Sequence, residues 1–217
     1  SLFTGCAKET SSLTTSGFAF NTTYTITVYQ GGTQKTLDTC VSKCADYEQV
    51  FSRTSKNSEL YQINQIEALY LTVVEQAMDL KDSFTKKRFY TKEQCESIIK
   101  QIEQKKTKEN TVKYSICQDG SITFEISALL ERIVKKGLEY SKKSDGRFDI
   151  AIEPVSSLWD FTVKKPTVPD EQKIEKALAY VDYQKIVLDD QKLTFQMPGM
   201  GIDLGGIAKG FIADELK

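Results

Sequence analysis

A glycine-rich segment at residues 197–214 combines residue types that can bind phosphate and a hard metal ion. It reads M-P-G-M-G-I-D-L-G-G-I-A-K-G-F-I-A-D, and a helix is predicted from Ile207 onward. Glycines let the backbone approach a ligand closely, and a helix start offers amide donors and the positive end of the helix dipole. Both features suit a phosphate group, so this segment is the strongest candidate site in the sequence.

Three residues of this segment could contact the ligand directly. Asp203 could hold a polar ligand group or support a metal shell, the carbonyl of Gly206 is a hard oxygen suited to Mg²⁺, and Lys209 adds positive charge one turn later. The Walker motif needs Gly-Lys-Ser/Thr, whereas Gly210 follows the lysine here, and the dinucleotide fingerprint needs a glycine where Leu204 stands. Glycine spacing alone is equally compatible with a tight turn before an ordinary helix.

Composition narrows the chemistry that the chain can perform. The sequence contains no histidine, which excludes Ser-His-Asp catalysis, Cys-His catalysis and His-ligated zinc within this chain. Carboxylates, hydroxyls, lysine and the backbone remain, and the sequence identifies no individual catalytic residue. The net charge of −1 gives no excess of basic charge for binding nucleic acid.

The elements that would position the site mix strands and helices. Residues 22–29 alternate as a half-buried strand does, and apolar residues at helical spacing follow between Leu37 and Phe51. A strand at 121–126 leads into a helix, another helix begins near Pro169, and the runs 186–188 and 193–195 predict a β-hairpin. Because there is no regular β-α-β repeat, we predict the α+β class.

The composition changes between residues 65 and 119. Helices are expected around residues 66–80 and 91–105, with a charged, solvated loop after the second. We interpret residues 65–119 as a helical insertion, with its helix pair packing on the outside of the domain.

The first residues resemble the processing site of a bacterial lipoprotein. The run S-L-F-T-G-C places small residues directly before Cys6, and a polar stretch follows. We expect residues 1–17 to be a tether, Cys6 to be lipidated, and the protein to be anchored to the cell membrane on its extracytoplasmic side. The alternative is a disordered terminus with a chance cysteine.

Four other cysteines permit disulfides if the protein is extracytoplasmic, although the sequence does not give their pairing. Cys40 and Cys44 are four residues apart on a predicted helix, so burial on one helix face is the simpler explanation for them. The remaining two are Cys95 and Cys117.

Several separated motifs resemble those of the ApbE family of FAD-dependent protein flavin transferases. Residues 202–210 read I-D-L-G-G-I-A-K-G and match its D-L-G-G-I-A-K-G signature. Residues 145–149, D-G-R-F-D, followed by Pro154 and residues 158–161, match its D-G-x-F-D…P…L-W-x-F block. Residues 51–64 match its F-S…S-E-L…I-N block. The motifs lie in the family's order and span most of residues 18–217.

The resemblance implies a Mg²⁺-dependent transfer of FMN from FAD to a Ser or Thr of a target protein through a phosphoester bond, with release of AMP. A divalent ion and a lysine would neutralise the charge that develops on the transferred phosphoryl group. The acceptor would belong to an extracytoplasmic electron-transfer system. The implied metal ligand is Gly206, through its carbonyl. The implied FAD contacts are Phe20, Thr54, Arg147, Phe148, Asp149, Asp203 and Lys209.

The chain departs from the family pattern in three places. Phe20-Asn21 stands where members often have Met-Gly, and Thr54 stands where many have a Tyr that stacks on the flavin. The Thr54 departure keeps Mg²⁺-dependent hydrolysis of FAD to FMN and AMP open as an alternative. Family members also continue well beyond the A-K-G helix, where further Mg²⁺ ligands lie. We therefore expect residues 18–217 to be the N-terminal part of a flavin transferase domain, with an incomplete metal site and little activity alone. This expectation favours a third function, that of a non-catalytic lipid-anchored flavin-binding protein.

Overall fold

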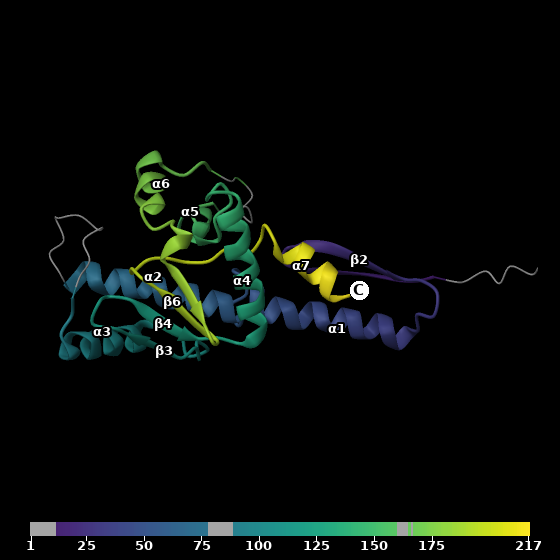
Figure 1. The fold of residues 1–217 in the computed structure, drawn as a ribbon, viewed down its shortest axis with the longest axis horizontal. Coiled ribbons are helices and arrows are strands. Elements are labelled where there is room, and N and C mark those ends of the chain that lie inside the picture. Colours follow the sequence, from purple (N-terminus) through teal and green to yellow (C-terminus); the bar gives the residue numbers. More distant parts are fainter. Residues whose placement is uncertain (1–11, 78–88, 160–164, 166) are drawn as a thin grey trace, which may run out of the picture.

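The computed structural model describes residues 12–77, 89–159, 165 and 167–217. Helices and antiparallel sheets are mixed in them, as the predicted α+β class requires. Figure 1 shows an elongated molecule. We call the hairpin of β1 (Leu13–Ala19) and β2 (Thr22–Val28), together with the long helix α1 (Gln34–Phe51), the arm, and the other elements the head. The C-terminal helix α7 (Ala208–Glu215) lies against α1 of the arm.

The arm consists of a two-stranded sheet packed on one helix. β1 and β2 pair antiparallel from Leu13 and Val28 at the open end to Ala19 and Thr22 at the turn. α1 begins at a Thr33 capping box and buries a stripe of apolar side chains toward the hairpin and the head. The predicted strand at 22–29 is confirmed. Residues 13–17, which we assigned to the tether, instead belong to β1 and pair with the predicted strand.

Helix α2 (Glu59–Ala77) corrects the expectation for residues 65–119. We expected the helices of this region on the outside of the domain, but Ile66, Tyr70 and Val73 of α2 are fully buried in the core. The apolar stripe starts at Leu60 and keeps helical spacing into the predicted insertion, so one continuous helix forms and its stripe is buried. The predicted C-terminal end of this helix lies outside the described residues.

A four-stranded antiparallel sheet forms the centre of the head. Its strand order is β3 (Tyr114–Ile116), β4 (Ile122–Glu125), β6 (Lys192–Phe195) and β5 (Ile186–Asp189). The predicted hairpin is confirmed as β5–β6, and Phe124 and Phe195 pack edge to face on one sheet face, with ring centroids 6.0 Å apart.

The remaining helices surround this sheet. α3 (Lys92–Lys105) begins after Thr91 and packs on α2, as the predicted second helix required. α4 (Ala128–Lys143) follows β4, and α6 (Glu171–Leu178) starts after an Asp170 N-cap, close to the predicted start near Pro169. Short helical turns lie between them: η1 (Ile150–Ile152), α5 (Glu153–Ser156) and η2 (Tyr183–Lys185).

The cysteines that the structure describes are unpaired. Cys40 and Cys44 are both buried on α1, as their spacing predicted; Cys95 is buried and Cys117 is exposed. Cys6 lies outside the described residues. Over the described part of the chain, no helix has the length and apolar character needed to cross a membrane.

Candidate functional site

The segment from Met200 to Leu204 is fixed to the core by alternate side chains. Met200, Ile202 and Leu204 are buried and join the main hydrophobic cluster, whereas Asp203 between them is only partly buried. The backbone N–H of Asp203 also donates to the carbonyl of Ile150, 2.9 Å away. These contacts hold the Asp203 carboxylate at the surface of the head on a rigid support.

Helix α2 holds the same segment through two polar side chains one turn apart. The Asn64 amide donates to the Ile202 carbonyl and accepts from the Ile202 N–H, with both distances 2.9 Å. Glu67 is fully buried, and its Oε2 accepts from the N–H of Gly199 at 2.9 Å. Burial raises the pKa of Glu67 well above its ordinary value and so favours the neutral form of this carboxyl. The helix that we expected outside the domain therefore positions the predicted site.

Gly206 allows a close approach between the turn and Phe148. A Cβ atom at position 206 would lie only 2.8 Å from Cε2 of the Phe148 ring. α7 begins two residues later, and its N-cap residue, Ile207, provides no side-chain hydrogen bond. Phe211 of α7 packs edge to face on Phe51 of α1, with ring centroids 5.7 Å apart, which fixes the helix to the arm.

The Asp203 carboxylate is the centre of a polar cluster. Its Oδ1 accepts from the N–H of Gly205 at 2.8 Å, and its Oδ2 accepts from the Ser156 hydroxyl at 2.8 Å. Nε of Arg53 lies 3.2 Å from the same Oδ2, and Nη1 of Arg53 lies 3.3 Å from Oε2 of Glu153. One guanidinium thus bridges two carboxylates that come from different parts of the chain.

Glu153 is the most perturbed carboxyl of this cluster. Burial is the main cause that raises its pKa to about 7, and the charge of Asp203 adds to the rise, while Arg53 opposes it. Its side chain is 13% exposed. Glu153 therefore changes charge near neutral pH beside the turn that carries Asp203.

Two adjoining cavities meet at this turn, and both are lined by Asp203 and Gly205. The smaller, of about 180 Å³, lies next to the tip of the arm hairpin and is called here the hairpin cavity. It contains the predicted site residues Phe20, Thr54, Asp203 and Lys209, together with Arg53.

Phe20 reaches the hairpin cavity because of the turn geometry. Phe20 and Asn21 have φ values of 53° and 56°, as the two central residues of a type I′ turn require. The turn is tied to the rest of the molecule because the Phe20 N–H donates to Glu48 and the Asn21 amide donates to the Thr54 hydroxyl. The hairpin therefore brings an aromatic ring and the loop after α1 to one cavity.

The larger cavity, of about 590 Å³, is called the Phe148 cavity. Besides Asp203 it is lined by Arg147, Phe148, Asp149 and Gly206. Asp149 is already engaged: its Oδ1 accepts from the N–H of Ala151 at 2.7 Å, and its Oδ2 accepts from the N–H of Tyr183 at 3.0 Å. The predicted FAD contact at Asp149 stays a prediction, and the structure adds an N-capping role for this residue.

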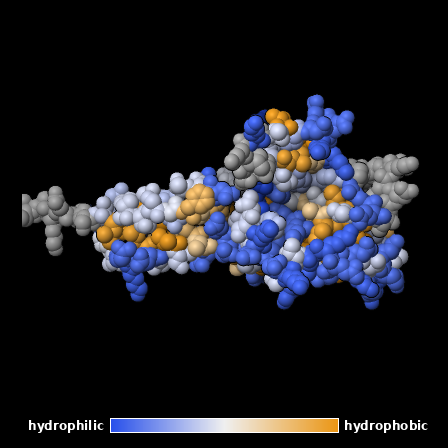
Figure 2. Space-filling view, turned by 180° about the vertical axis from the view of Figure 1, so that it is seen from behind, coloured by the Kyte–Doolittle hydropathy of each residue, from blue (hydrophilic) through white to orange (hydrophobic). Residues whose placement is uncertain are grey.

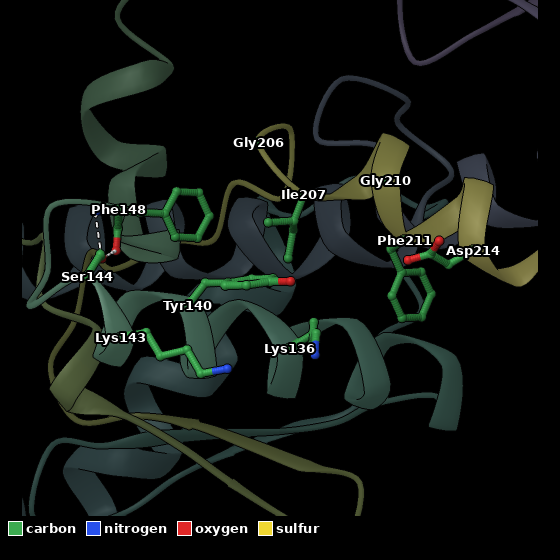
Figure 3. A pocket seen from close by; sticks show the side chains of 10 residues that line it. All are labelled: Lys136, Tyr140, Lys143, Ser144, Phe148, Gly206, Ile207, Gly210, Phe211 and Asp214. Atoms are coloured by element: carbon green, nitrogen blue, oxygen red, sulfur yellow. Dashed lines mark hydrogen bonds between the residues drawn. The ribbon is translucent and has the colours of Figure 1, made fainter.

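A third cavity, of about 520 Å³, lies on the other side of Phe148 and Gly206. Figure 3 shows Tyr140 lying along its floor on α4, with Phe211 of α7 on one side and Lys136 and Lys143 below. The Nζ atoms of both lysines lie within 5.8 Å of the Tyr140 ring centroid. Phe148 and Gly206 line both this cavity and the Phe148 cavity, which makes the turn at 203–206 the meeting point of three hollows.

The described residues do not form a metal centre on their own. No group of three or more Asp, Glu or Cys side chains in these parts of the chain could hold a metal ion. The Asp203 carboxylate is occupied by Arg53, Ser156 and the Gly205 N–H. The predicted ligand at Gly206 is one backbone carbonyl, which does not fit a complete Mg²⁺ shell by itself.

The structure places the predicted FAD contacts and the predicted metal ligand at these hollows, whereas the predicted lipidation site, Cys6, lies outside the described residues. The residues at the hollows are Phe20, Thr54, Arg147, Phe148, Asp149, Asp203, Gly206 and Lys209. The sequence interpretation did not identify the residues that hold them, namely Arg53, Glu153, Asn64 and Glu67. Arg53, Glu153 and Asn64 stand inside or beside the quoted motifs, so the motifs could have suggested them, whereas Glu67 has no sequence signal.

Comparison with known proteins gives one consistent result. The family model described as "ApbE family" matches residues 70–217. A protein named FAD:protein FMN transferase from Klebsiella pneumoniae is 40% identical over 75 residues, covering 34% of this chain and 24% of the relative. One of the same name from Haemophilus influenzae is 28% identical over 136 residues, covering 58% of this chain and 39% of the relative.

Solved structures share the fold. The flavin transferase ApbE from Vibrio cholerae aligns over 95% of this chain and 52% of its own, with a TM-score of 0.62 and 18% identity. The ApbE protein from Thermotoga maritima aligns over 95% and 51%, with a TM-score of 0.59 and 20% identity. The present chain thus spans about half the length of these structures, and 24% and 39% of the two curated relatives above.

Proposed function

The chain belongs to the ApbE family, and we propose that it serves in transferring FMN from FAD to a serine or threonine of a target protein. In this reaction the acceptor hydroxyl oxygen attacks the phosphorus of the FMN moiety. The pyrophosphate P–O bond breaks, AMP leaves with the bonding electron pair, and the hydroxyl proton is lost. The product is a phosphoester between FMN and the acceptor protein.

The observation that carries this proposal is the junction of two cavities at the turn around Asp203. A dinucleotide needs room on both sides of its pyrophosphate, and the hairpin cavity and the Phe148 cavity supply adjoining spaces of about 180 and 590 Å³. Lys209 lines the first and Arg147 the second, and both are exposed cations able to face phosphate oxygens. Phe20 and Phe148 offer one aromatic ring in each cavity for a flavin or an adenine.

We propose that the reaction depends on Mg²⁺ and that the Gly206 carbonyl is one of the ligands. Bound Mg²⁺ would withdraw charge from the phosphoryl oxygens. Since the described residues supply no acidic metal cluster, the role of this chain lies in the turn that carries Gly206 and in Lys209. These residues would orient the pyrophosphate and neutralise part of its charge.

The test is incubation of the protein, extended to the length of its relatives, with FAD, Mg²⁺ and a threonine-containing acceptor protein; residues 18–217 alone are expected to show little activity. Covalent flavin on the acceptor, detected by mass spectrometry together with released AMP, is expected. The yield should fall to background when EDTA removes the metal and should fall at least tenfold in Lys209→Gln, since a charged hydrogen bond to phosphate is lost. Binding of FAD without any AMP release would contradict the transfer and support a non-catalytic flavin carrier.

Hydrolysis of FAD to FMN and AMP is a second candidate, favoured by Thr54. This exposed side chain lines the hairpin cavity and contacts Asn21 there, so position 54 offers the flavin a small hydroxyl instead of an aromatic ring. The same incubation distinguishes the two reactions: free FMN in amounts equal to AMP, with unmodified acceptor, indicates hydrolysis.

We propose further that the protein works outside the cytoplasm, anchored by a lipid on Cys6, and that its acceptor is an extracytoplasmic electron-transfer protein. Support comes from the small residues before Cys6 and the polar stretch after it. Expression in a bacterium behind a lipoprotein signal peptide, followed by membrane fractionation, tests the anchor. Cys6→Ser should move the protein from the membrane to the soluble fraction.

A further inference from the structure

Arg53 is presented by a loop whose backbone is firmly held. The Ser52 hydroxyl accepts from the N–H groups of Thr54 at 3.3 Å and Ser55 at 3.0 Å, which closes a tight turn around Arg53. The buried hydroxyl of Ser58 donates to the Ser52 carbonyl from the other side. The loop therefore fixes where the Arg53 side chain starts, independently of any ligand.

The ion pairs of Arg53 leave its guanidinium available. Its two contacts, to Asp203 at 3.2 Å and to Glu153 at 3.3 Å, are longer than the usual 2.7–2.9 Å of a charge-assisted hydrogen bond. They involve different carboxylates and different nitrogens, so neither is the parallel two-bond arrangement that holds arginine most firmly. The side chain is 26% exposed, and it lines the hairpin cavity together with Lys209.

The Arg53 guanidinium therefore lies beside the hairpin cavity, and only two long ion pairs within the protein engage it. We propose that Arg53 binds a phosphate of the flavin nucleotide in the hairpin cavity, and that Glu153 competes with that phosphate for the guanidinium. The inference rests on the proposed function, because it assumes that a flavin nucleotide occupies this cavity. Arg53 and Lys209 together would place two positive charges against the ligand, while Asp203 keeps the guanidinium oriented.

Because Glu153 and the flavin phosphate compete for Arg53, the affinity for the flavin nucleotide depends on the charge of Glu153. The charged groups that face Glu153 are Arg53, from the loop after α1, and Asp203, from the turn before α7; the Ser156 hydroxyl lies 3.3 Å away on its own helix. Since its pKa is raised to about 7, Glu153 loses its charge as the pH falls through neutrality and then stops competing. Affinity for FAD, whose pyrophosphate keeps its charge over this range, should therefore rise from pH 8 to pH 6, whereas affinity for riboflavin, which carries no phosphate, should not.

Ligand affinities of matched variants test the proposal. Dissociation constants for FAD, FMN and riboflavin are measured by flavin fluorescence on the wild-type chain and on Arg53→Gln, Arg53→Lys, Glu153→Gln and Lys56→Gln. Lys56 is an exposed cation of the same loop and lines none of the cavities described above, so its variant controls for the loss of one charge. Circular dichroism and thermal unfolding establish that each variant is folded.

Arg53→Gln should weaken FAD binding by about tenfold to a hundredfold and leave riboflavin within twofold, because only a charged hydrogen bond to phosphate is lost. Arg53→Lys should recover part of the loss. Glu153→Gln should bind FAD more tightly than wild type at pH 8 and show little change between pH 8 and pH 6. Lys56→Gln should match wild type.

An equal loss of FAD and riboflavin affinity in Arg53→Gln would overturn the inference, since it would point to a disturbed cavity. FAD affinity unchanged in Arg53→Gln would overturn it too, and both results would leave the proposed function standing. A wild-type chain that binds no flavin nucleotide would instead overturn the use of this cavity in the proposed function, and the inference with it.

Discussion

Both carboxylate oxygens of Asp149 accept hydrogen bonds from the backbone, one from Ala151 in η1 and one from Tyr183 in η2. Asp149→Ala should therefore destabilise the fold by about 1–3 kcal/mol even without a ligand, because two buried or partly buried donors lose their acceptor. Asp149→Asn keeps one acceptor oxygen and should cost less. Urea unfolding of the ligand-free protein measures the loss in both variants. If Asp149→Ala were as stable as the wild type, the two hydrogen bonds would not stabilise the fold, and contact with a ligand would be the remaining role of Asp149.

Asn64 gives a second residue-scale prediction, because its amide both donates to and accepts from Ile202. Asn64→Asp keeps the acceptor but replaces the donor by an oxygen facing the Ile202 carbonyl. It should lower the free energy of unfolding by about 2 kcal/mol and weaken FAD binding, since the turn around Asp203 is released. Asn57→Ala, on the exposed loop before α2, is the control and should change neither quantity. Lower stability with unchanged FAD affinity would separate the turn from the ligand.

The site residues that could be predicted from the sequence are those that lie within a motif. Asp203, Gly206 and Lys209 stand in one contiguous stretch, and the structure places all three at the cavities. Arg53 and Glu153 are a hundred positions apart, so their ion pair exists only because the loop after α1 and the start of α5 meet at the turn. A pair of that kind depends on the packing of three segments, which a single sequence does not display.

At the scale of elements, the sequence predicts helices that have capping signals and one polar face. The prediction was wrong for α2, which we expected on the outside of the domain and which is buried in the core. α3 has a Thr91 capping box and a clear apolar stripe, and its bounds agree with the prediction. α2 is apolar over a wider surface, since it contacts α1, α3 and the turn at 199–202 at once. A helix surrounded in this way has no strong amphipathic pattern, so its place in the core was not visible.

Gly137 in the middle of α4 allows this helix to pack closely against η1 and against Ile207, the residue before α7. A Cβ atom there would lie 2.7 Å from Cγ2 of the buried Ile150 and 3.3 Å from Cδ1 of Ile207. Gly137→Ala should therefore lower the free energy of unfolding by about 1–3 kcal/mol through overpacking, although alanine is the better helix former.

Gly210 of α7 is the matched control for Gly137. A Cβ atom at position 210 would point into open space, with no atom of another described element within 4 Å. Gly210→Ala should therefore be neutral or stabilise the protein by up to about 1 kcal/mol. Chemical unfolding of the two variants side by side measures the difference. If both substitutions stabilised the protein, α4 would not be packed against η1 as closely as the structure has it.

The whole molecule divides the site between its two parts. The arm supplies Phe20 and leads into the loop with Arg53, and the head supplies the turn with Asp203, so the hairpin cavity forms where arm and head meet. Figure 2 shows hydrophobic residues gathered along the arm, and the hairpin leaves Phe18 68% exposed. Because the hairpin cavity lies between the arm and the head, its stability depends on the contacts of α7 with α1, among them the Phe51–Phe211 pair.

Two carboxyls near the site, the buried Glu67 and the partly buried Glu153, make the stability of the whole molecule depend on pH. Burial raises the pKa of both, that of Glu153 from 4.5 to about 7. Between these two values the folded chain binds more protons than the unfolded chain, so the stability that these groups contribute is complete below about pH 4.5 and is lost as the pH rises. At about 1.4 kcal/mol per pH unit, the loss at Glu153 amounts to about 3 kcal/mol.

Glu153→Gln removes this titration and should flatten the profile. The difference in unfolding free energy between wild type and Glu153→Gln, measured in urea at pH 4.5, 6 and 8, should shift by about 3 kcal/mol in favour of the variant across that range. Glu67→Gln should shift in the same direction, because its amide oxygen can still accept from Gly199 without becoming charged. Glu109→Gln, on an exposed loop, should give a constant difference. Parallel profiles for Glu153→Gln and Glu109→Gln would show that Glu153 is solvated in the folded protein, and that the turn around Asp203 is more open to water than the burial of its neighbours indicates.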